Sequence, residues 1–102
     1  MLVNVLMHKG PSLGRPQADT IKGSVFSNMK ELRVQSAGHP LRIFFAFDPR
    51  RMAILLIGGD KTGNKRFYEQ MIPLADEIYR RHLIEIGIDP HRVMEVDHGE
   101  KI

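Results

Sequence analysis

The stretch LRIFFAFDPRRMAILLIGG, from Leu41 to Gly59, contains two apolar segments separated by a short charged turn. The first segment is rich in aromatic and β-branched residues, which is typical of a central strand. The second is almost continuously apolar, as expected for a strand that is covered on both faces. The residues DPRR between them form a hairpin loop, because Pro49 favours a turn. The stretch therefore predicts two antiparallel strands, at residues 41–47 and 52–59.

A third strand is predicted upstream, where MKELRVQ at residues 29–35 alternates apolar and polar side chains. The sequence SAGHP, with Gly38 and Pro40, predicts the turn that joins this strand to the central one. Residues 29–59 are therefore expected to form an antiparallel meander. Farther upstream, GPSLGRP is typical of a loop, and QADTIKGS at residues 17–24 is expected to hold a short helical turn.

A helical region follows the meander, with apolar side chains that recur at helical spacing. Asn64 is placed to cap its first turn. Pro73 should kink the helix or split it into residues 64–71 and 73–86, because proline removes a backbone donor and clashes with the preceding turn. Gly87 is typical of the end of a helix.

The chain of 102 residues is expected to form one domain, with a core of about residues 10–86 and an acidic tail at residues 87–102. The tail is expected to hold at most one more helical turn. The fold class predicted is α+β, with a curled antiparallel sheet of three or four strands under helical cover.

The composition excludes several classes of protein. The sequence has no cysteine, so it forms neither disulfides nor thiolate metal sites. No apolar run approaches the roughly 20 residues that span a membrane, and the N-terminal MLVNVLM is too short for a secretory signal. We therefore expect a cytoplasmic protein that makes no membrane contact.

Positive charge is concentrated in the first two thirds of the chain. Residues 1–66 have a net charge of +7, whereas residues 67–102 have a net charge of −4. This asymmetry indicates an anionic partner, with nucleic acid as the first candidate; a solvated surface with a chance asymmetry is the alternative. The basic residues on and around the meander are Lys30, Arg33, Arg42, Arg50, Arg51, Lys61, Lys65 and Arg66, and His39 is the one histidine expected beside them.

The segment LLIGGDKTGNKRFYEQ resembles a phosphate-binding loop, but its spacing does not fit one. A P-loop requires lysine and a hydroxyl residue directly after its second glycine, and here Asn64 follows Gly63. The segment is better interpreted as a turn between a strand and a helix. Tyr68 begins that helix, where it is placed to converge with Lys61 and neighbouring cations on one phosphate.

Arg42 interrupts the apolar central strand, and two interpretations of its surroundings remain open. Strand alternation places it on one face with Phe44 and Ala46, while the opposite face, which carries Phe45, is expected to be the better core face. Arg42 and Phe44 then form a nucleic-acid surface, with charge for phosphate and a ring for stacking. Alternatively, Phe44 belongs to the core beneath a helix and Arg42 lies at its rim.

Three segments, NMKELRVQ, RIFFAFDPRRMAILLIGGDKTG and RFYEQMIPLADEIYRRHL, resemble the HigB-like, phage-derived branch of the RelE/ParE toxin superfamily. The resemblance covers about residues 10–83 and implies a RelE-like fold. It also implies a bacterial toxin that pairs with an antitoxin, of the helix-turn-helix type, and cuts mRNA in the ribosome. The cut uses no metal and no cofactor, and the 2′-hydroxyl attacks the adjacent phosphate. Gyrase inhibition, as in ParE members, and a non-catalytic binding protein are the alternatives.

The resemblance also assigns roles to residues. It implies catalytic roles for Arg42 and Lys61 at the phosphate and for Tyr68 as base or orienting group. The lysines that RelE members carry before the position of Arg33 are not matched here, because Glu31 and its neighbour occupy those positions. The residues expected to bind RNA are Lys30, Arg33, His39, Phe44, Arg50, Arg51, Lys65 and Arg66.

Family members usually carry a longer N-terminal region, and only nine residues precede Gly10 in this sequence. A shorter front would expose apolar sheet surface. We therefore expect the chain to form a homo-oligomer that covers this surface.

Overall fold

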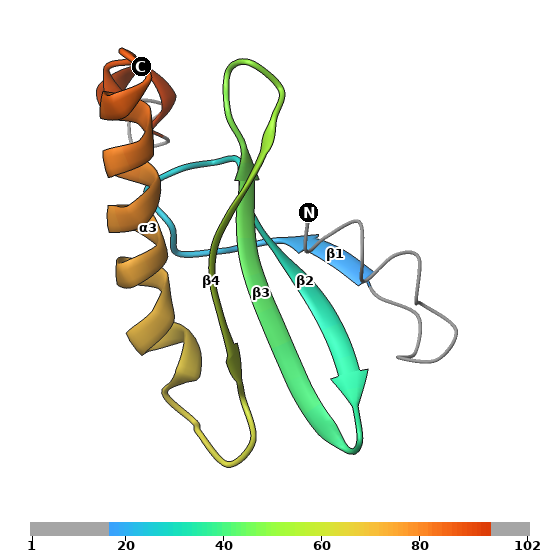
Figure 1. Cartoon of the computed structure of the whole chain (residues 1–102). Coiled ribbons are helices and arrows are strands. Elements are labelled where there is room, and N and C mark those ends of the chain that lie inside the picture. Colours follow the sequence, from blue (N-terminus) through green and yellow to red (C-terminus); the bar gives the residue numbers. More distant parts are fainter. Residues whose placement is uncertain (1–16, 95–102) are drawn as a thin grey trace.

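A computed structural model of the chain describes residues 17–94. Four strands form one antiparallel sheet in the order β1-β2-β3-β4, and helix α3 lies along one side of it (Figure 1). This arrangement confirms the predicted α+β class. The elements are β1 (Gln17–Thr20), β2 (Met29–Ser36), β3 (His39–Phe47), β4 (Ala53–Asp60), α3 (Phe67–Glu85) and the 3-10 helix η1 (Pro90–Val93).

The segment QADTIKGS begins with a strand, so the expected helical turn is wrong. Its first four residues form β1, which pairs with β2 so that Asp19 lies opposite Glu31. All four side chains of β1 are exposed. A short polar segment such as this has no hydrophobic period of its own, and only its pairing with β2 makes it a strand.

The β2–β3 hairpin is tighter than the sequence suggests. Only Ala37 and Gly38 lie between the strands, both with positive φ, at 52° and 82°. Such a pair is typical of the two-residue turns that match the twist of a hairpin. Pro40, expected in the turn, belongs to β3, where its carbonyl accepts a hydrogen bond from the amide of Lys61 at 2.9 Å.

The β3–β4 loop is organised by a buried carboxylate. The side chain of Asp48 accepts hydrogen bonds from the backbone amides of Arg50 and Met52, at 2.9 and 3.1 Å. It also lies 2.7 Å from an Nη atom of Arg50 and 3.0 Å from Nε2 of His82, near the end of α3. The loop therefore contains five residues, 48–52, and is tied to the helix at this end of the sheet.

Helix α3 is continuous, so the predicted split at Pro73 is wrong. Pro73 has no backbone N–H, so the carbonyl of Glu69 lacks its usual helical hydrogen bond. Both residues lie on the exposed side of the helix, where water can donate a hydrogen bond to this carbonyl instead. The helix begins later than expected, because Asn64 closes a preceding turn by accepting a hydrogen bond from the amide of Arg66 at 3.0 Å. Gly87, at φ 82°, ends the helix as predicted.

None of the helices within residues 17–94 is both long and apolar enough to cross a membrane.

The main core lies between α3 and the sheet face that carries Phe44. Tyr79 and Leu83 of α3 are fully buried there, and Phe26 packs edge-on against Tyr79 with ring centroids 4.9 Å apart. Beyond the helix, η1 and the residues around it add Ile88, Val93 and Met94 to the edge of this core. Part of the segment expected as an acidic tail thus packs against the fold, and residues 95–102 lie outside the described part.

The opposite sheet face holds a smaller cluster of Leu32, Val34 and Phe45. The prediction that this face is the better core face is wrong, because α3 packs on the other one. Both faces of β3 are apolar along most of their length, so strand alternation alone does not select the face that the helix covers.

Asp76 on α3 anchors the connection between β1 and β2. Its carboxylate accepts hydrogen bonds from the hydroxyl of Ser24 at 2.5 Å and from the backbone amide of Val25 at 3.3 Å. Both Ser24 and Asp76 are buried. The connection that leads from β1 into the core is therefore tied to the middle of the helix.

We predict that Asp76→Ala lowers the free energy of unfolding by about 1–3 kcal/mol, because it leaves buried donors without an acceptor. Urea unfolding followed by circular dichroism measures the change. Glu77→Ala is the matched control, since Glu77 is a neighbouring carboxylate whose ion pairs with Arg80 and Arg81 are exposed and contribute less than about 1 kcal/mol. Equal losses in the two variants would contradict the anchoring role.

A second prediction concerns acid stability and Asp48. Burial acts to raise the pKa of Asp48, but hydrogen bonds from Arg50, His82 and two backbone amides outweigh it and hold the pKa far below its usual range. A group with a lowered folded pKa stabilises the fold above its unfolded pKa of about 3.9, and this contribution is lost as the pH falls toward the folded value.

The stability advantage of the wild-type chain over Asp48→Asn should therefore shrink when the pH is lowered from about 6 to about 2. Urea unfolding of both proteins across this range measures it. A difference that stays constant with pH would mean that the charge of Asp48 does not contribute.

Candidate functional site

The carboxylate of Glu31 is the centre of a polar cluster on the sheet face that α3 covers. Its Oε1 accepts a hydrogen bond from the hydroxyl of Tyr68 at 2.7 Å, and its Oε2 accepts one from Nε of Arg33 at 3.2 Å. Nε of Arg42 lies 3.6 Å from Oε1 of Glu31 and donates a hydrogen bond to the Tyr68 hydroxyl at 3.1 Å. A carboxylate, two guanidinium groups and a phenol thus form one connected network.

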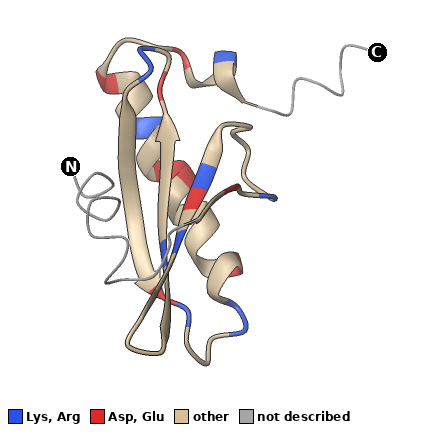
Figure 2. Cartoon of the chain, turned by 90° about the vertical axis from the view of Figure 1, so that its right-hand side faces the viewer, with Lys and Arg blue, Asp and Glu red and all other residues tan. Residues whose placement is uncertain are grey.

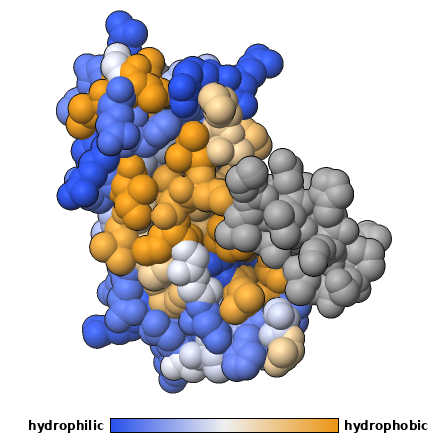
Figure 3. Space-filling view, in the orientation of Figure 1, coloured by the Kyte–Doolittle hydropathy of each residue, from blue (hydrophilic) through white to orange (hydrophobic). Residues whose placement is uncertain are grey.

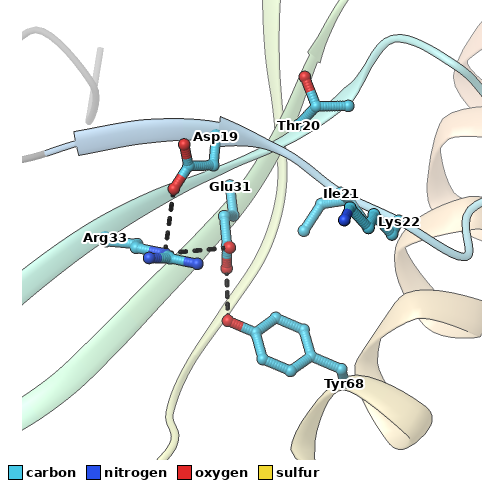
Figure 4. A pocket seen from close by; sticks show the side chains of 7 residues that line it. All are labelled: Asp19, Thr20, Ile21, Lys22, Glu31, Arg33 and Tyr68. Atoms are coloured by element: carbon cyan, nitrogen blue, oxygen red, sulfur yellow. Dashed lines mark hydrogen bonds and ion pairs between the residues drawn. The ribbon is translucent and has the colours of Figure 1, made fainter.

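Strand register brings these side chains together. Arg33 on β2 lies directly opposite Arg42 on β3, and Glu31 is two residues before Arg33 on the same face. Tyr68 is the second residue of α3 and reaches the cluster from the helix. Figure 4 shows the carboxylate of Glu31 between Arg33 and the Tyr68 hydroxyl.

Burial sets the electrostatic character of the cluster. The side chains of Glu31 and Arg42 are 4% and 13% exposed, whereas that of Arg33 is 45% exposed. Burial raises the pKa of Tyr68, and its hydrogen bond to Glu31 raises it further, against an opposing effect of Arg42. The hydrogen bond to Glu31 also raises the pKa of Arg33. At neutral pH Tyr68 is therefore a hydrogen-bond donor, and Arg33 is a cation.

Two hollows adjoin the cluster and share Arg33. The larger, of about 500 Å³, lies between β1 and Tyr68 and has Glu31 at its side (Figure 4). The smaller, of about 210 Å³, is lined in part by Gln17 and Arg42. The site is therefore open to solvent on both sides of an exposed guanidinium group. The full lining of the larger hollow is Asp19, Thr20, Ile21, Lys22, Glu31, Arg33 and Tyr68.

The loop between β4 and α3 supplies further cations beside Tyr68. Nζ of Lys61 lies 5.8 Å from the centre of the Tyr68 ring. His39, on the adjoining hairpin, lies 3.0 Å from a carboxylate oxygen of Asp60 and 3.3 Å from the Thr62 hydroxyl. Lys65 and Arg66 are exposed in the same loop. This end of the sheet therefore combines the network with a basic rim.

Other residues expected to bind RNA lie elsewhere. Lys30 is on the opposite face of β2, where it contacts Thr20 and lines a hollow with Phe45. Arg50 and Arg51 are in the β3–β4 loop, at the other end of the sheet from the β4–α3 loop (Figure 2). The structure therefore does not bring these three cations to the site around Glu31.

The ring of Phe44 is fully buried in the main core, next to the rings of Phe67 and Tyr68. It presents no face to solvent, so the expected stacking of a base on Phe44 does not fit this arrangement. The alternative interpretation, in which Phe44 belongs to the core and Arg42 lies near its rim, describes the structure.

The sequence does not identify two acidic residues of the site as functional candidates. It shows Glu31 only as a mismatch to a lysine, and it predicts a helical turn around Asp19. The signal for Glu31 is its spacing, because a carboxylate two residues before an arginine on a strand shares its face. Asp19 gives no such signal, since only the pairing of β1 with β2 places its Oδ2 at 3.4 Å from Nε of Arg33.

Within residues 17–94, no three His, Cys, Asp or Glu side chains are grouped so as to hold a metal ion.

The fold and site describe a small α+β domain in which one carboxylate, two guanidinium groups and a phenol form a network on one face of the sheet. The chain belongs to the Gp49-like family of phage-derived proteins, whose model matches residues 1–80. It is 57% identical to "Putative toxin HigB3" of Mycobacterium tuberculosis (strain ATCC 25618 / H37Rv) over 76 residues. These aligned residues make up 74% of this chain and 65% of that protein.

A second relative, "Putative toxin HigB2" of the same organism, is 47% identical over 85 residues, which cover 81% of this chain and 42% of that protein. The chain thus spans less than two thirds of either relative. No solved structure matches it significantly. The resemblance to the HigB-like branch of the RelE/ParE superfamily is confirmed by the family match and these identities.

The hydrogen bond between Tyr68 and Glu31 gives a direct prediction. Glu31→Gln removes the negative charge that disfavours the phenolate, so the pKa of Tyr68 should fall from its raised position. NMR of ring-labelled tyrosine measures this titration.

The pKa of Tyr79, the other tyrosine, is raised by burial, and Glu31 does not contribute to its shift. It is therefore the internal control and should not respond to Glu31→Gln. A Tyr68 titration that is unchanged in this variant would show that the hydrogen bond is absent in solution.

Proposed function

We propose that this chain carries the toxin activity of a type II toxin–antitoxin pair and cuts mRNA on the ribosome. The observation that carries the proposal is the carboxylate of Glu31, which faces an open hollow and contacts Arg33, Arg42 and Tyr68. The family match and the names of the two relatives support the toxin class.

The reaction proposed is attack by a 2′-hydroxyl on the adjacent phosphorus. It requires a base for the 2′-proton, cations for the charge that develops on the phosphate oxygens, and an acid for the 5′-oxygen. Arginine stays protonated and cannot be the base. The Tyr68 hydroxyl donates a hydrogen bond to Glu31 and its pKa is raised, so the phenol keeps its proton at neutral pH and is not available as the base.

Glu31 is the base that this geometry supports. A carboxylate has about four acceptor positions, and two hydrogen bonds, from Tyr68 and Arg33, occupy part of them. Arg42 also contacts Oε1, and only 4% of the side chain is exposed, so the proposal requires a 2′-hydroxyl to reach the carboxylate from the hollow that Glu31 lines. In this assignment Tyr68 is not the base, and its hydrogen bond orients the carboxylate of Glu31.

In this reaction the cations contact different oxygens of the phosphate. Arg33 and Arg42 are cross-strand neighbours beside Glu31, and we assign them to the non-bridging oxygens. We assign Lys61, which lies next to the Tyr68 ring, as the acid for the leaving 5′-oxygen. Lys65, Arg66 and His39 form a rim for the neighbouring RNA backbone.

A non-catalytic binding protein is the second candidate, because Glu31 neutralises part of the charge of the two arginines. In such a protein Glu31 would only hold the cations in place. The effect of Glu31 on binding and on cleavage therefore separates the two candidates.

We propose that a cognate antitoxin, of the helix-turn-helix type, and a second copy of the chain are further partners. Apolar side chains gather on the surface over α3 and the strand beside it (Figure 3). Leu74 and Ile78 of the helix are 51% and 37% exposed, which supports a partner on this side. Size-exclusion chromatography with light scattering tests the homo-oligomer, and co-purification from an intact operon tests the antitoxin.

Glu31→Gln should lower mRNA cleavage by about 10²-fold or more, the usual scale for a lost base, and strengthen ribosome binding because a negative charge is removed. Arg42→Ala should weaken both cleavage and binding, since it removes a phosphate contact. Tyr68→Phe should lower cleavage and leave binding unchanged. Mapping of new mRNA 5′ ends in a translation reaction measures cleavage, and sedimentation with ribosomes measures binding.

Glu85→Gln, which removes an exposed carboxylate on α3, is the matched control and should behave as wild type. Cleavage that survives Glu31→Gln would exclude Glu31 as the base. Well-folded wild-type protein that binds ribosomes but produces no new mRNA ends would favour the binding protein.

A further inference from the structure

The hollow of about 500 Å³ beside Glu31 is larger than the chemistry at the phosphate requires. Its volume lies in the range of about 300–1,000 Å³ that is typical of small-ligand sites. One wall is Tyr68, and the other is formed by β1 and the residues after it, with Asp19 on the side opposite Tyr68 (Figure 4). None of the roles assigned above uses Asp19, Thr20 or Ile21.

We propose that this hollow binds the base of the nucleotide next to the scissile phosphate, and that Asp19 selects guanine there. The proposal rests on the function proposed above and adds its specificity. The arrangement of the two hollows supports it, because they share Arg33. A phosphate on Arg33 and Arg42 therefore has the larger hollow immediately beside it.

The charges of the hollow favour a base over a second phosphate. Two carboxylates, Asp19 and Glu31, line it together with the cations Lys22 and Arg33. Carboxylates repel phosphate and accept hydrogen bonds from N–H groups. The side chain of Ile21 and the ring of Tyr68 add apolar contact of the kind that covers the faces of a base.

Asp19 is placed to read the edge of that base. Its side chain is 49% exposed, and Nε of Arg33 lies 3.4 Å from Oδ2. Within residues 17–94, no hydrogen bond to the Asp19 carboxylate is formed. The group therefore retains acceptor capacity toward the hollow.

Guanine matches this carboxylate best. Its N1–H and exocyclic N2–H lie side by side and can donate to the two oxygens of one carboxylate. Uracil presents a single N–H between two carbonyl oxygens, which the carboxylate repels. Adenine and cytosine each present one amino group next to an acceptor nitrogen. A preference for guanine, with uracil disfavoured most, follows from this chemistry.

Binding of mononucleotides to the intact chain tests the proposal without any cleavage. In NMR titrations, GMP should bind about tenfold more tightly than UMP, the usual scale for one bidentate base contact, and should shift signals of Asp19 and Tyr68. Asp19→Asn should remove this preference, because the amide presents one acceptor and one donor. Glu85→Gln, which changes an exposed carboxylate far from the hollow, should retain it.

Cleavage mapping provides the second arm. Wild-type cuts should be enriched next to guanine, and Asp19→Asn should lose this enrichment among whatever cuts it still makes. Equal binding of GMP and UMP, or a GMP preference that survives Asp19→Asn, overturns the proposal whatever the cleavage results are. An Asp19-dependent GMP preference in a protein that never cuts supports the base pocket and contradicts the endonuclease function alone.

Discussion

The contact between Glu31 and the two arginines is the constraint on which the functional face depends. Arg33 and Arg42 are directly opposite each other on neighbouring strands, an arrangement that is destabilising for like charges. The carboxylate of Glu31 lies between them and offsets this repulsion. The carboxylate therefore favours the pairing of these two strands, and because it is buried, salt screens its attraction to the arginines less.

The same type of interaction holds α3 along its whole length. A carboxylate accepts a hydrogen bond near the start of the helix, from Tyr68 to Glu31, in the middle, from Ser24 to Asp76, and near the end, where His82 contacts Asp48. Apolar packing of Phe44, Tyr79 and their neighbours fills the space between these points. The helix is thus fixed in register against the sheet, and this register places the Tyr68 hydroxyl within 2.7 Å of Glu31. Catalysis by preorganised groups requires this kind of rigid support.

Sequence patterns predict the strands and helix whose apolar residues recur with a strong period. They do not predict the elements whose structure depends on contacts with distant parts of the chain. The strands at residues 29–35 and 41–47 and the helix end at Gly87 follow from alternation and glycine chemistry. In contrast, β1 is polar and exposed, and it is a strand only because β2 pairs with it. The covered face of the sheet was mispredicted because β3 is apolar on both sides.

The sequence predicts which cations lie at the site, namely Arg42 and Lys61, but it does not predict the carboxylates beside them. Arg42, Lys61 and Tyr68 were expected to meet, and the structure brings them together around one ring and one hydroxyl. In the sequence, Glu31 is only a mismatch to the lysine of RelE members, because the sequence does not show that Arg33 and Arg42 face each other on neighbouring strands. Asp19 depended on the unpredicted strand β1. The count of charges therefore predicts a basic face, whereas the strand register places Glu31, the base of the proposed reaction, between the two arginines.

Glu31 also gives the site a distinctive balance between binding and chemistry. A purely cationic face would bind RNA more tightly, because each cation that contacts phosphate releases counter-ions, but it would contain no group able to accept the 2′-proton. Placing one carboxylate among the arginines weakens the attraction for the backbone and supplies that acceptor. In the proposed function the ribosome presents the mRNA, so the toxin needs less affinity of its own, and the proposal therefore accommodates the positive charge that Glu31 neutralises.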